Sequence, residues 1–148
     1  MHVIKLIEDD SSLQGVTVTK EFQDALFVSA DQGLIIQVVQ NILRNAIESL
    51  SERQQKEVQI KTYADEAWVY FSITDTGSGI NKEILNDIFK PFFSTKGAYS
   101  KGITSQSKFQ GTGLGLSVSK AIIASHNGDI MVTSTIGVGS TFIIKIPN

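Results

Sequence analysis

The feature that most constrains the fold is a run of apolar residues at helical spacing between residues 31 and 51. Asp31 stands where a helix N-cap is expected, and apolar positions then recur every three or four residues. They are Leu34, Ile35, Val38, Val39, Ile42, Leu43, Ala46, Ile47 and Leu50. At about 100° per residue these side chains cover a wide arc, so the predicted helix is largely buried and needs a second layer to cover it.

Alternating apolar and polar residues predict the strands that could form this layer. The clearest segment runs from Trp68 to Asp75, with Val69, Phe71 and Ile73 on one face. Other strands are predicted at 16–19, 26–28, 58–62, 130–135 and 141–146, the last two joined through Gly137 and Gly139, and further helices at 81–89 and 114–125. This mixture predicts an α+β fold, a two-layer α/β sandwich in which helices cover one face of a mixed sheet.

Length and composition limit the class of protein. The chain has 148 residues, which predicts a single domain over residues 1–148. It has no cysteine and only two histidines, His2 and His126, which argues against a zinc site. A net charge of -2 gives no reason to expect binding to nucleic acid or direct contact with a membrane. No apolar run has membrane-spanning length, so a cytoplasmic location is expected, and a membrane anchor elsewhere in a longer protein is left open.

Two asparagines in the predicted helix share one stripe. Asn41 and Asn45 are four residues apart, and Gln37 and Glu48 fall beside them at the border of the apolar arc. Amide and carboxylate oxygens at such a border are ligands that suit magnesium. The alternative interpretation is a solvated helix edge.

An aspartate ends the clearest strand. Asp75 continues the inward row of that strand and is followed by Thr76-Gly77-Ser78-Gly79, in which two glycines permit a sharp turn and a close approach to a flat ligand. A carboxylate at the mouth of an apolar pocket can accept a hydrogen bond from an exocyclic amine such as that of adenine. The alternative is an ordinary Asp-Gly turn.

A glycine-rich segment opens the predicted helix at 114–125. Gly111-Thr112-Gly113-Leu114-Gly115-Leu116 would expose backbone N–H groups and the positive end of the helix dipole to a phosphate. The preceding polar segment at about 94–112 is predicted to be a mobile lid; it carries Lys96, Lys101 and Lys108 and no acidic residue from Ser94 to Gln110. The spacing fits neither a P-loop nor a dinucleotide-binding motif. A flexible linker is the alternative.

The order of these segments resembles the ATP-binding catalytic domain of sensor histidine kinases, in the Bergerat-fold superfamily that also contains gyrase, heat-shock chaperone and mismatch-repair ATPases. Residues 41–46 are similar to the asparagine box of these kinases, 75–80 to the first glycine box, 89–96 to the phenylalanine box and 111–116 to the second glycine box. The ending at 137–142 also matches. The resemblance covers roughly residues 16–147.

The resemblance implies a role for each matched residue. Asn45 would coordinate Mg²⁺, and Asn41, with Glu48 as a further candidate, would support the metal and the phosphates. Asp75 would bind the adenine amine, and Gly79 and Thr141 would complete the adenine pocket. The phenylalanines Phe89, Phe92 and Phe93 would anchor the lid, or act as core aromatics. The implied ATP-binding set is Asn41, Asn45, Asp75, Gly77, Gly79, Ile80, Lys96, Gly111, Thr112, Gly113, Leu114, Gly115, Leu116 and Thr141.

The resemblance also implies the chemistry. ATPases of the superfamily that hydrolyse ATP place a glutamate base four residues before the metal asparagine, where this chain has Asn41. ATP would therefore be held for transfer of its γ-phosphate to a histidine on a separate helical dimerisation domain, which would pass it to a response regulator in a two-component system. The sequence contains no such helical domain, so the chain is expected to be an excised domain or a docking partner. A regulatory nucleotide-binding module without transfer and a serine-directed kinase are the alternatives.

Two departures from the family pattern lead to their own expectations. His126-Asn127-Gly128 stands where the family has His-Gly-Gly, and we expect His126 to be a structural residue at a helix end. The span from Lys96 to Gly111 is longer than a minimal lid, and it is expected to order when a nucleotide or partner binds.

Overall fold

The computed structural model describes residues 13–93 and 114–148. The expected lid at about 94–112, which includes Lys96, lies outside the described residues, and so do His2, Gly111, Thr112 and Gly113.

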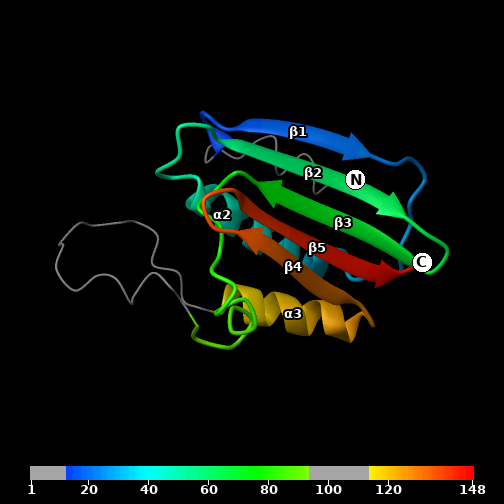
Figure 1. The fold of residues 1–148 in the computed structure, drawn as a ribbon. Coiled ribbons are helices and arrows are strands. Elements are labelled where there is room, and N and C mark those ends of the chain that lie inside the picture. Colours follow the sequence, from blue (N-terminus) through cyan, green and yellow to red (C-terminus); the bar gives the residue numbers. More distant parts are fainter. Residues whose placement is uncertain (1–12, 94–113) are drawn as a thin grey trace.

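Five strands form one mixed sheet (Figure 1). They are β1 (Thr17–Phe22), β2 (Glu57–Ala64), β3 (Trp68–Asp75), β4 (Asp129–Thr135) and β5 (Gly139–Pro147). Their order in the sheet is β1-β2-β3-β5-β4. β1 runs parallel to β2, because the chain crosses from one to the other through a helix, and every other neighbouring pair is antiparallel.

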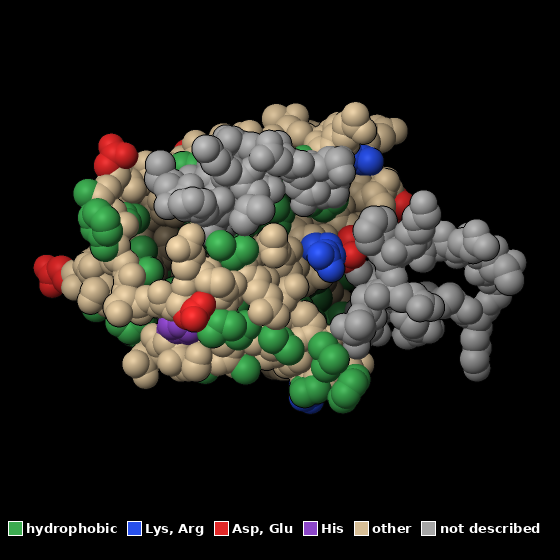
Figure 2. Space-filling model, turned by 180° about the vertical axis from the view of Figure 1, so that it is seen from behind, with side chains coloured by type: hydrophobic (Ala, Val, Ile, Leu, Met, Phe, Trp, Pro, Cys, Tyr) green, Lys and Arg blue, Asp and Glu red, His purple; other side chains and the backbone are tan. Residues whose placement is uncertain are grey.

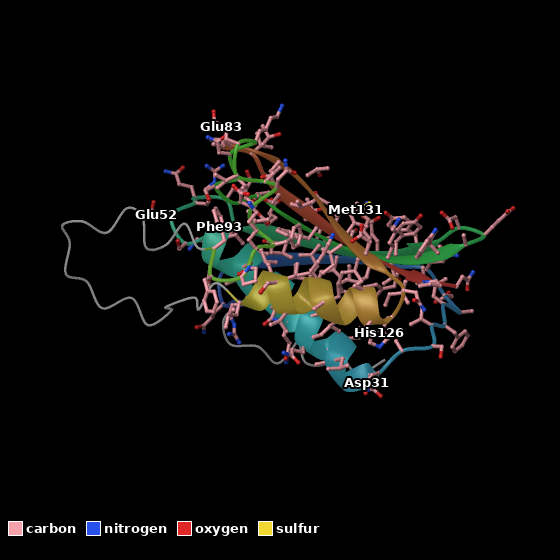
Figure 3. The ribbon with its side chains drawn as sticks, turned by 90° about the horizontal axis from the view of Figure 1, so that it is seen from below. Asp31, Glu52, Glu83, Phe93, His126 and Met131 are labelled. Atoms are coloured by element: carbon pink, nitrogen blue, oxygen red, sulfur yellow. The ribbon has the colours of Figure 1, made fainter. Side chains whose placement is uncertain are left out.

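The described residues contain two helices, α2 (Gln32–Ser49) and α3 (Gly115–Ser125). Both lie on the same side of the sheet, behind the strands in Figure 1 and below them in Figure 3. The expected architecture, a mixed sheet covered on one face by helices, is confirmed. No helix of the described residues combines the length and apolar character that a membrane crossing requires.

The core lies between the helices and the sheet face toward them. Val38, Val39 and Ile42 of α2 are at most 2% exposed, as the wide apolar arc predicts. They meet the inward side chains of the strands, where Ile73 of β3 stands opposite Ile60 on one neighbour and Phe142 on the other. Strand alternation carries this inward row on to Asp75, so the fold directs a carboxylate toward the helix layer.

The two helices are joined at the end where α2 begins. Asp31 caps α2, because its side chain accepts a hydrogen bond from the backbone N–H of Leu34. The backbone N–H of Asp31 in turn donates to Nε2 of His126, at 3.0 Å, and Nδ1 of His126 lies 2.8 Å from the carbonyl oxygen of Ile122. His126 is therefore a structural residue at the end of α3, as expected (Figure 3). Figure 2 shows the molecule from behind, on the side where the helices lie.

Two expected elements are absent from the described structure. Residues 26–28 form a loop rather than a strand, with Phe27 80% exposed and Ala25 in the left-handed backbone region at φ 58°. Residues 82–89 form successive turns rather than a helix, because three-residue bonds such as those from Ile84 N–H to Asn81 O and from Asp87 N–H to Ile84 O dominate.

Candidate functional site

The carboxylate of Asp75 is the most buried charged group of the described residues. Asp75 is 3% exposed at the end of β3. Its Oδ1 accepts two hydrogen bonds, one from the backbone N–H of Gly77 at 2.8 Å and one from the hydroxyl of Ser49 at 3.1 Å. Ser49 belongs to the last turn of α2, so this carboxylate connects the sheet to the helix that carries the asparagines.

Burial raises the pKa of the Asp75 carboxyl above its ordinary value. Hydrogen bonds from Gly77 N–H, the Ser49 hydroxyl and Ser140 N–H act in the opposite direction, but they do not cancel the cost of desolvating the charge. A buried carboxyl whose charge destabilises the ligand-free domain is typical of a ligand-binding site.

The loop after Asp75 is held against the β4–β5 hairpin. The backbone N–H of Ile80 donates to Oγ of Ser134 at 2.7 Å, and the N–H of Gly137 donates to the carbonyl oxygen of Ser78 at 2.8 Å. Gly79, at φ 73°, packs so closely that an added Cβ would stand 2.2 Å from the carbonyl oxygen of Thr135. Only glycine fits both this backbone conformation and this approach.

The neighbouring strand β5 presents a serine, rather than the expected threonine, on the Asp75 side. Asp75 pairs with Ser140, and Thr74 pairs with Thr141. Thr141 therefore points to the opposite sheet face, where its hydroxyl lies 3.0 Å from that of Thr74. The structure does not bring the Thr141 side chain to Asp75, because adjacent residues of a strand face opposite ways.

The two asparagines lie where α2 meets the beginning of α3. Nδ2 of Asn41 donates to the carbonyl oxygen of Gly115 at 3.4 Å and to Oγ of Ser119 at 3.3 Å. The half-buried side chain of Asn45 makes no hydrogen bond within the described part of the chain. Of the stripe predicted from helical spacing, Asn41 therefore faces the start of α3, and Glu48 is half buried further along α2.

The start of α3 is suited to bind an anion. Its N-cap residue, Leu114, makes no side-chain cap hydrogen bond, and its first turn holds no acidic side chain. By contrast, α2 is capped by its own aspartate. Backbone N–H groups at the start of a helix attract phosphate through hydrogen bonding and the helix dipole. Leu114, Gly115 and Leu116 thus lie at a helix start whose chemistry suits an anion, next to Asn41.

The donor set at this place suits a magnesium ion that a phosphate also coordinates. Within residues 13–93 and 114–148, no three His, Asp or Glu side chains cluster as a metal site. Mg²⁺ usually keeps several waters and takes few protein ligands beside substrate phosphates. The amide of Asn45, one turn beyond Asn41 on α2 and without a hydrogen bond to the described residues, matches that requirement.

The three phenylalanines before the predicted lid lie in different environments. Phe89 and Phe93 are partly buried against the core, and Nζ of Lys120 lies 4.9 Å from the centre of the Phe89 ring. Phe92 is 77% exposed with φ 62°, a strained conformation for a bulky residue. Phe89 and Phe93 thus pack against the core, whereas Phe92 does not.

Ser49 and Arg53 are among the residues around the site that were not predicted. Ser49 continues the asparagine stripe at positions 41, 45 and 49, so helical spacing contained a signal for it. Arg53 had no such signal. Its Nε donates to the carbonyl oxygen of Thr76 at 3.1 Å and its Nη2 to that of Gly137 at 2.8 Å, so the guanidinium joins the glycine loop to the β4–β5 turn.

Comparison with known proteins decides the family. The model of the histidine kinase-, DNA gyrase B- and HSP90-like ATPases matches residues 30–148. The chain belongs to this ATPase family. It is 40% identical over 120 residues to the signal transduction histidine-protein kinase AtoS of Escherichia coli, which covers 81% of this chain. It is 33% identical over 146 residues to sporulation kinase A of Bacillus subtilis, covering 98% of this chain.

A solved structure supports the same assignment. The catalytic domain of histidine kinase ThkA superposes with a TM-score of 0.78 at 32% identity, and the match covers 99% of this chain and 89% of that one. The chain spans 18% of the length of AtoS and 22% of that of sporulation kinase A. It thus corresponds to the ATPase domain of such kinases, and the resemblance seen in the sequence is confirmed.

Proposed function

We propose that this domain binds Mg²⁺-ATP between α2, the glycine loop after β3 and the start of α3, and donates the γ-phosphate to a histidine on a separate helical domain. The observation that carries the proposal is the buried Asp75 carboxylate. Its burial raises its pKa, and Ser49 and Gly77 hold it beside a tightly packed glycine loop. The ATPase family assignment supports the choice of nucleotide.

Asp75 is proposed to select adenine. Ser49 and Gly77 both bond to Oδ1, and Oδ2 is proposed to accept the exocyclic amine. Gly79 and Ile80 would form the wall of the pocket, since their loop is fixed to Ser134 and Thr135. We propose Ser140, rather than Thr141, as the β5 side chain on this side, because the sheet register places it opposite Asp75.

Asn45 and Asn41 are proposed to hold the metal and phosphate end, with Glu48 as a further candidate ligand. When bound, magnesium would neutralise charge on the transferred phosphate. The start of α3, with Gly115 as its first residue, would orient the phosphates through backbone N–H groups. Gly77, Leu114, Leu116 and the residues outside the described ranges, Lys96, Gly111, Thr112 and Gly113, remain predicted parts of the same site.

The residues near the phosphates favour transfer over hydrolysis. Position 41 carries an amide that donates to Gly115 and Ser119, and an amide cannot take a proton from water. The γ-phosphoryl group would pass to an imidazole nitrogen of the acceptor and ADP would leave. The site contributes position and charge stabilisation rather than a base.

Replacing Asn45 with alanine is expected to lower the affinity for ATP about ten- to a hundredfold when Mg²⁺ is present, because the loss of one ligand to a charged group costs on the order of 1.5–3 kcal/mol. Affinity for ATP without Mg²⁺ should stay within about twofold. Calorimetric titration in both conditions measures the effect. The matched control is Gln40→Ala, an exposed position on the same helix. Equal losses with and without Mg²⁺ would rule out a metal role for Asn45.

Phosphate transfer is tested by incubating the chain with radiolabelled ATP, Mg²⁺ and a purified dimeric phosphoacceptor-histidine domain. Acid-labile, base-stable label on the acceptor is the expected result, and Asn45→Ala should abolish most of it. Acid-stable label would indicate a serine-directed kinase instead. Tight ATP binding without label on any tested acceptor would indicate a regulatory module. Either of these results contradicts the proposed histidine kinase activity.

A further inference from the structure

A buried hydroxyl at the start of α3 fixes the direction of a neighbouring amide. Ser119 is 0% exposed, and its Oγ touches two polar groups. It donates to the carbonyl oxygen of Gly115, one helical turn back, at 2.7 Å. It also lies 3.3 Å from Nδ2 of Asn41 on α2. A serine hydroxyl has a single hydrogen, and here the short bond to Gly115 uses it. Toward Asn41, Ser119 can therefore act only as an acceptor.

The second atom that faces the Asn41 amide is also an acceptor. The carbonyl oxygen of Gly115 lies 3.4 Å from Nδ2, and a carbonyl cannot donate. If the amide turned over, Oδ1 would face two oxygen lone pairs with no hydrogen between them. This arrangement therefore permits one orientation only, with the NH₂ group toward α3 and Oδ1 directed away from these two acceptors.

Asn45 shows that this constraint is specific to position 41. Both asparagines are half buried on the same stripe of α2, yet the Asn45 side chain has no hydrogen bond that fixes it within the described residues. The close approach of α3 also restricts the Asn41 side chain, because a Cβ on Gly115 would lie in ordinary contact with Cγ of Asn41, at 3.7 Å. The two amides therefore differ in preorganisation although their residue type and spacing are the same.

We propose that Ser119 is a positioning residue that orients the Asn41 amide, so that Oδ1 of Asn41 is presented toward the magnesium ion that would accompany the phosphates. The inference rests on the proposed function and extends it to a residue on the far side of Asn41. Groups behind a metal ligand set its orientation, and their removal commonly lowers metal affinity about 10–100-fold. Gly115 supplies the other acceptor, so the loss on removing Ser119 should lie near the lower end of that range.

The test is calorimetric titration of ATP with and without Mg²⁺. The quantity of interest is the magnesium enhancement, the ratio of the two affinities. Ser119→Ala is expected to reduce this enhancement about tenfold while leaving magnesium-free binding within about twofold. The matched control is Ser125→Ala on the same helix, whose hydroxyl bonds one turn back to Ile122 at the same 2.7 Å but lies at the opposite end from Asn41. It should leave the enhancement unchanged.

A double-mutant cycle with Asn41→Ala separates orientation from general support of the fold. If Ser119 acts through Asn41, then Ser119→Ala should have no further effect on the magnesium enhancement in the Asn41→Ala background. A full additional loss in that background, or an unchanged enhancement in Ser119→Ala, overturns the positioning role alone. A wild-type chain that binds ATP equally well with and without Mg²⁺ overturns the proposed metal site, and the role of Ser119 with it.

Discussion

Replacing Asp75 with asparagine is expected to weaken ATP binding about ten- to a hundredfold. The carboxylate accepts from Ser49 and Gly77 through Oδ1, and an asparagine amide can keep these two bonds. What the amide cannot do is accept from adenine through the second atom, which becomes an NH₂ group. Loss of a charged hydrogen bond in a buried pocket costs on the order of 1.5–3 kcal/mol.

The same substitution is expected to leave the empty domain at least as stable at neutral pH. Burial raises the folded-state pKa of Asp75 above 3.8, the value in the unfolded chain. Just above pH 3.8 the folded state still holds the proton that the unfolded chain has released, so stability from this group falls as the pH rises through that window. At neutral pH the ionised carboxylate is thus a net cost to the fold, and Asp75→Asn removes this cost.

The two effects are measured on one pair of proteins. Calorimetry gives the affinity for ATP, and thermal unfolding from pH 4 to pH 8 gives the stability of each. Relative to Asp75→Asn, the wild type should lose stability as the pH rises, and it should bind ATP more tightly. A variant that unfolds more readily at neutral pH and binds ATP normally would falsify the assignment of Asp75 to the adenine contact.

Replacing Gly79 with alanine is expected to cost about 2–5 kcal/mol of stability and to abolish measurable ATP binding. The added Cβ would stand 2.2 Å from the carbonyl oxygen of Thr135 and 2.9 Å from Cα of Ile136. Both are backbone atoms of the β4–β5 hairpin, so the loop or the hairpin must move. Left-handed backbone strain adds about 1–2 kcal/mol and the overlap about 1–3 kcal/mol. The displaced loop begins at Asp75, so the proposed adenine pocket should be lost with it.

Gly137→Ala is a matched control for this prediction. Gly137 has φ 77°, close to the 73° of Gly79, but an added Cβ there meets nothing within 4 Å. The control therefore carries the same backbone strain without the overlap, and it should cost only about 1–2 kcal/mol while ATP still binds. Urea unfolding and ATP titration of both variants measure the difference. Equal losses of stability would mean that backbone conformation alone, and not close packing against the hairpin, requires glycine at position 79.

Local patterns in the chain predicted the parts of the fold that local forces control. The apolar period from Leu34 to Leu50 indicated a buried helix, and the alternation from Trp68 to Asp75 indicated a strand with Asp75 on its inward face. The predictions for two other segments were wrong, because local composition did not decide their structure. Residues 26–28 have strand-forming composition but form a loop, and residues 82–89 have helix-forming composition but form separate turns.

Such patterns predicted only part of the candidate site. Asn41, Asn45 and Asp75 stand at positions that spacing and alternation identify, and the glycines between strand and helix mark where the backbone turns. Thr141 was chosen by resemblance, yet the sheet register sets Ser140 opposite Asp75. A shift of one residue along a strand changes the face of the sheet, and the pattern of a single strand does not reveal its register with a neighbour.

The sequence by itself determined which side chains share a helix stripe or a strand face, because fixed backbone periods place them there. Only the tertiary structure decided which of these groups meet. Ser49 contacts Asp75 across 26 residues, Asn41 contacts Ser119 across 78, and Arg53 reaches Gly137 across 84. Such contacts depend on how helices pack on the sheet and how strands are aligned. That arrangement is set by burial of the whole apolar core and not by any segment alone.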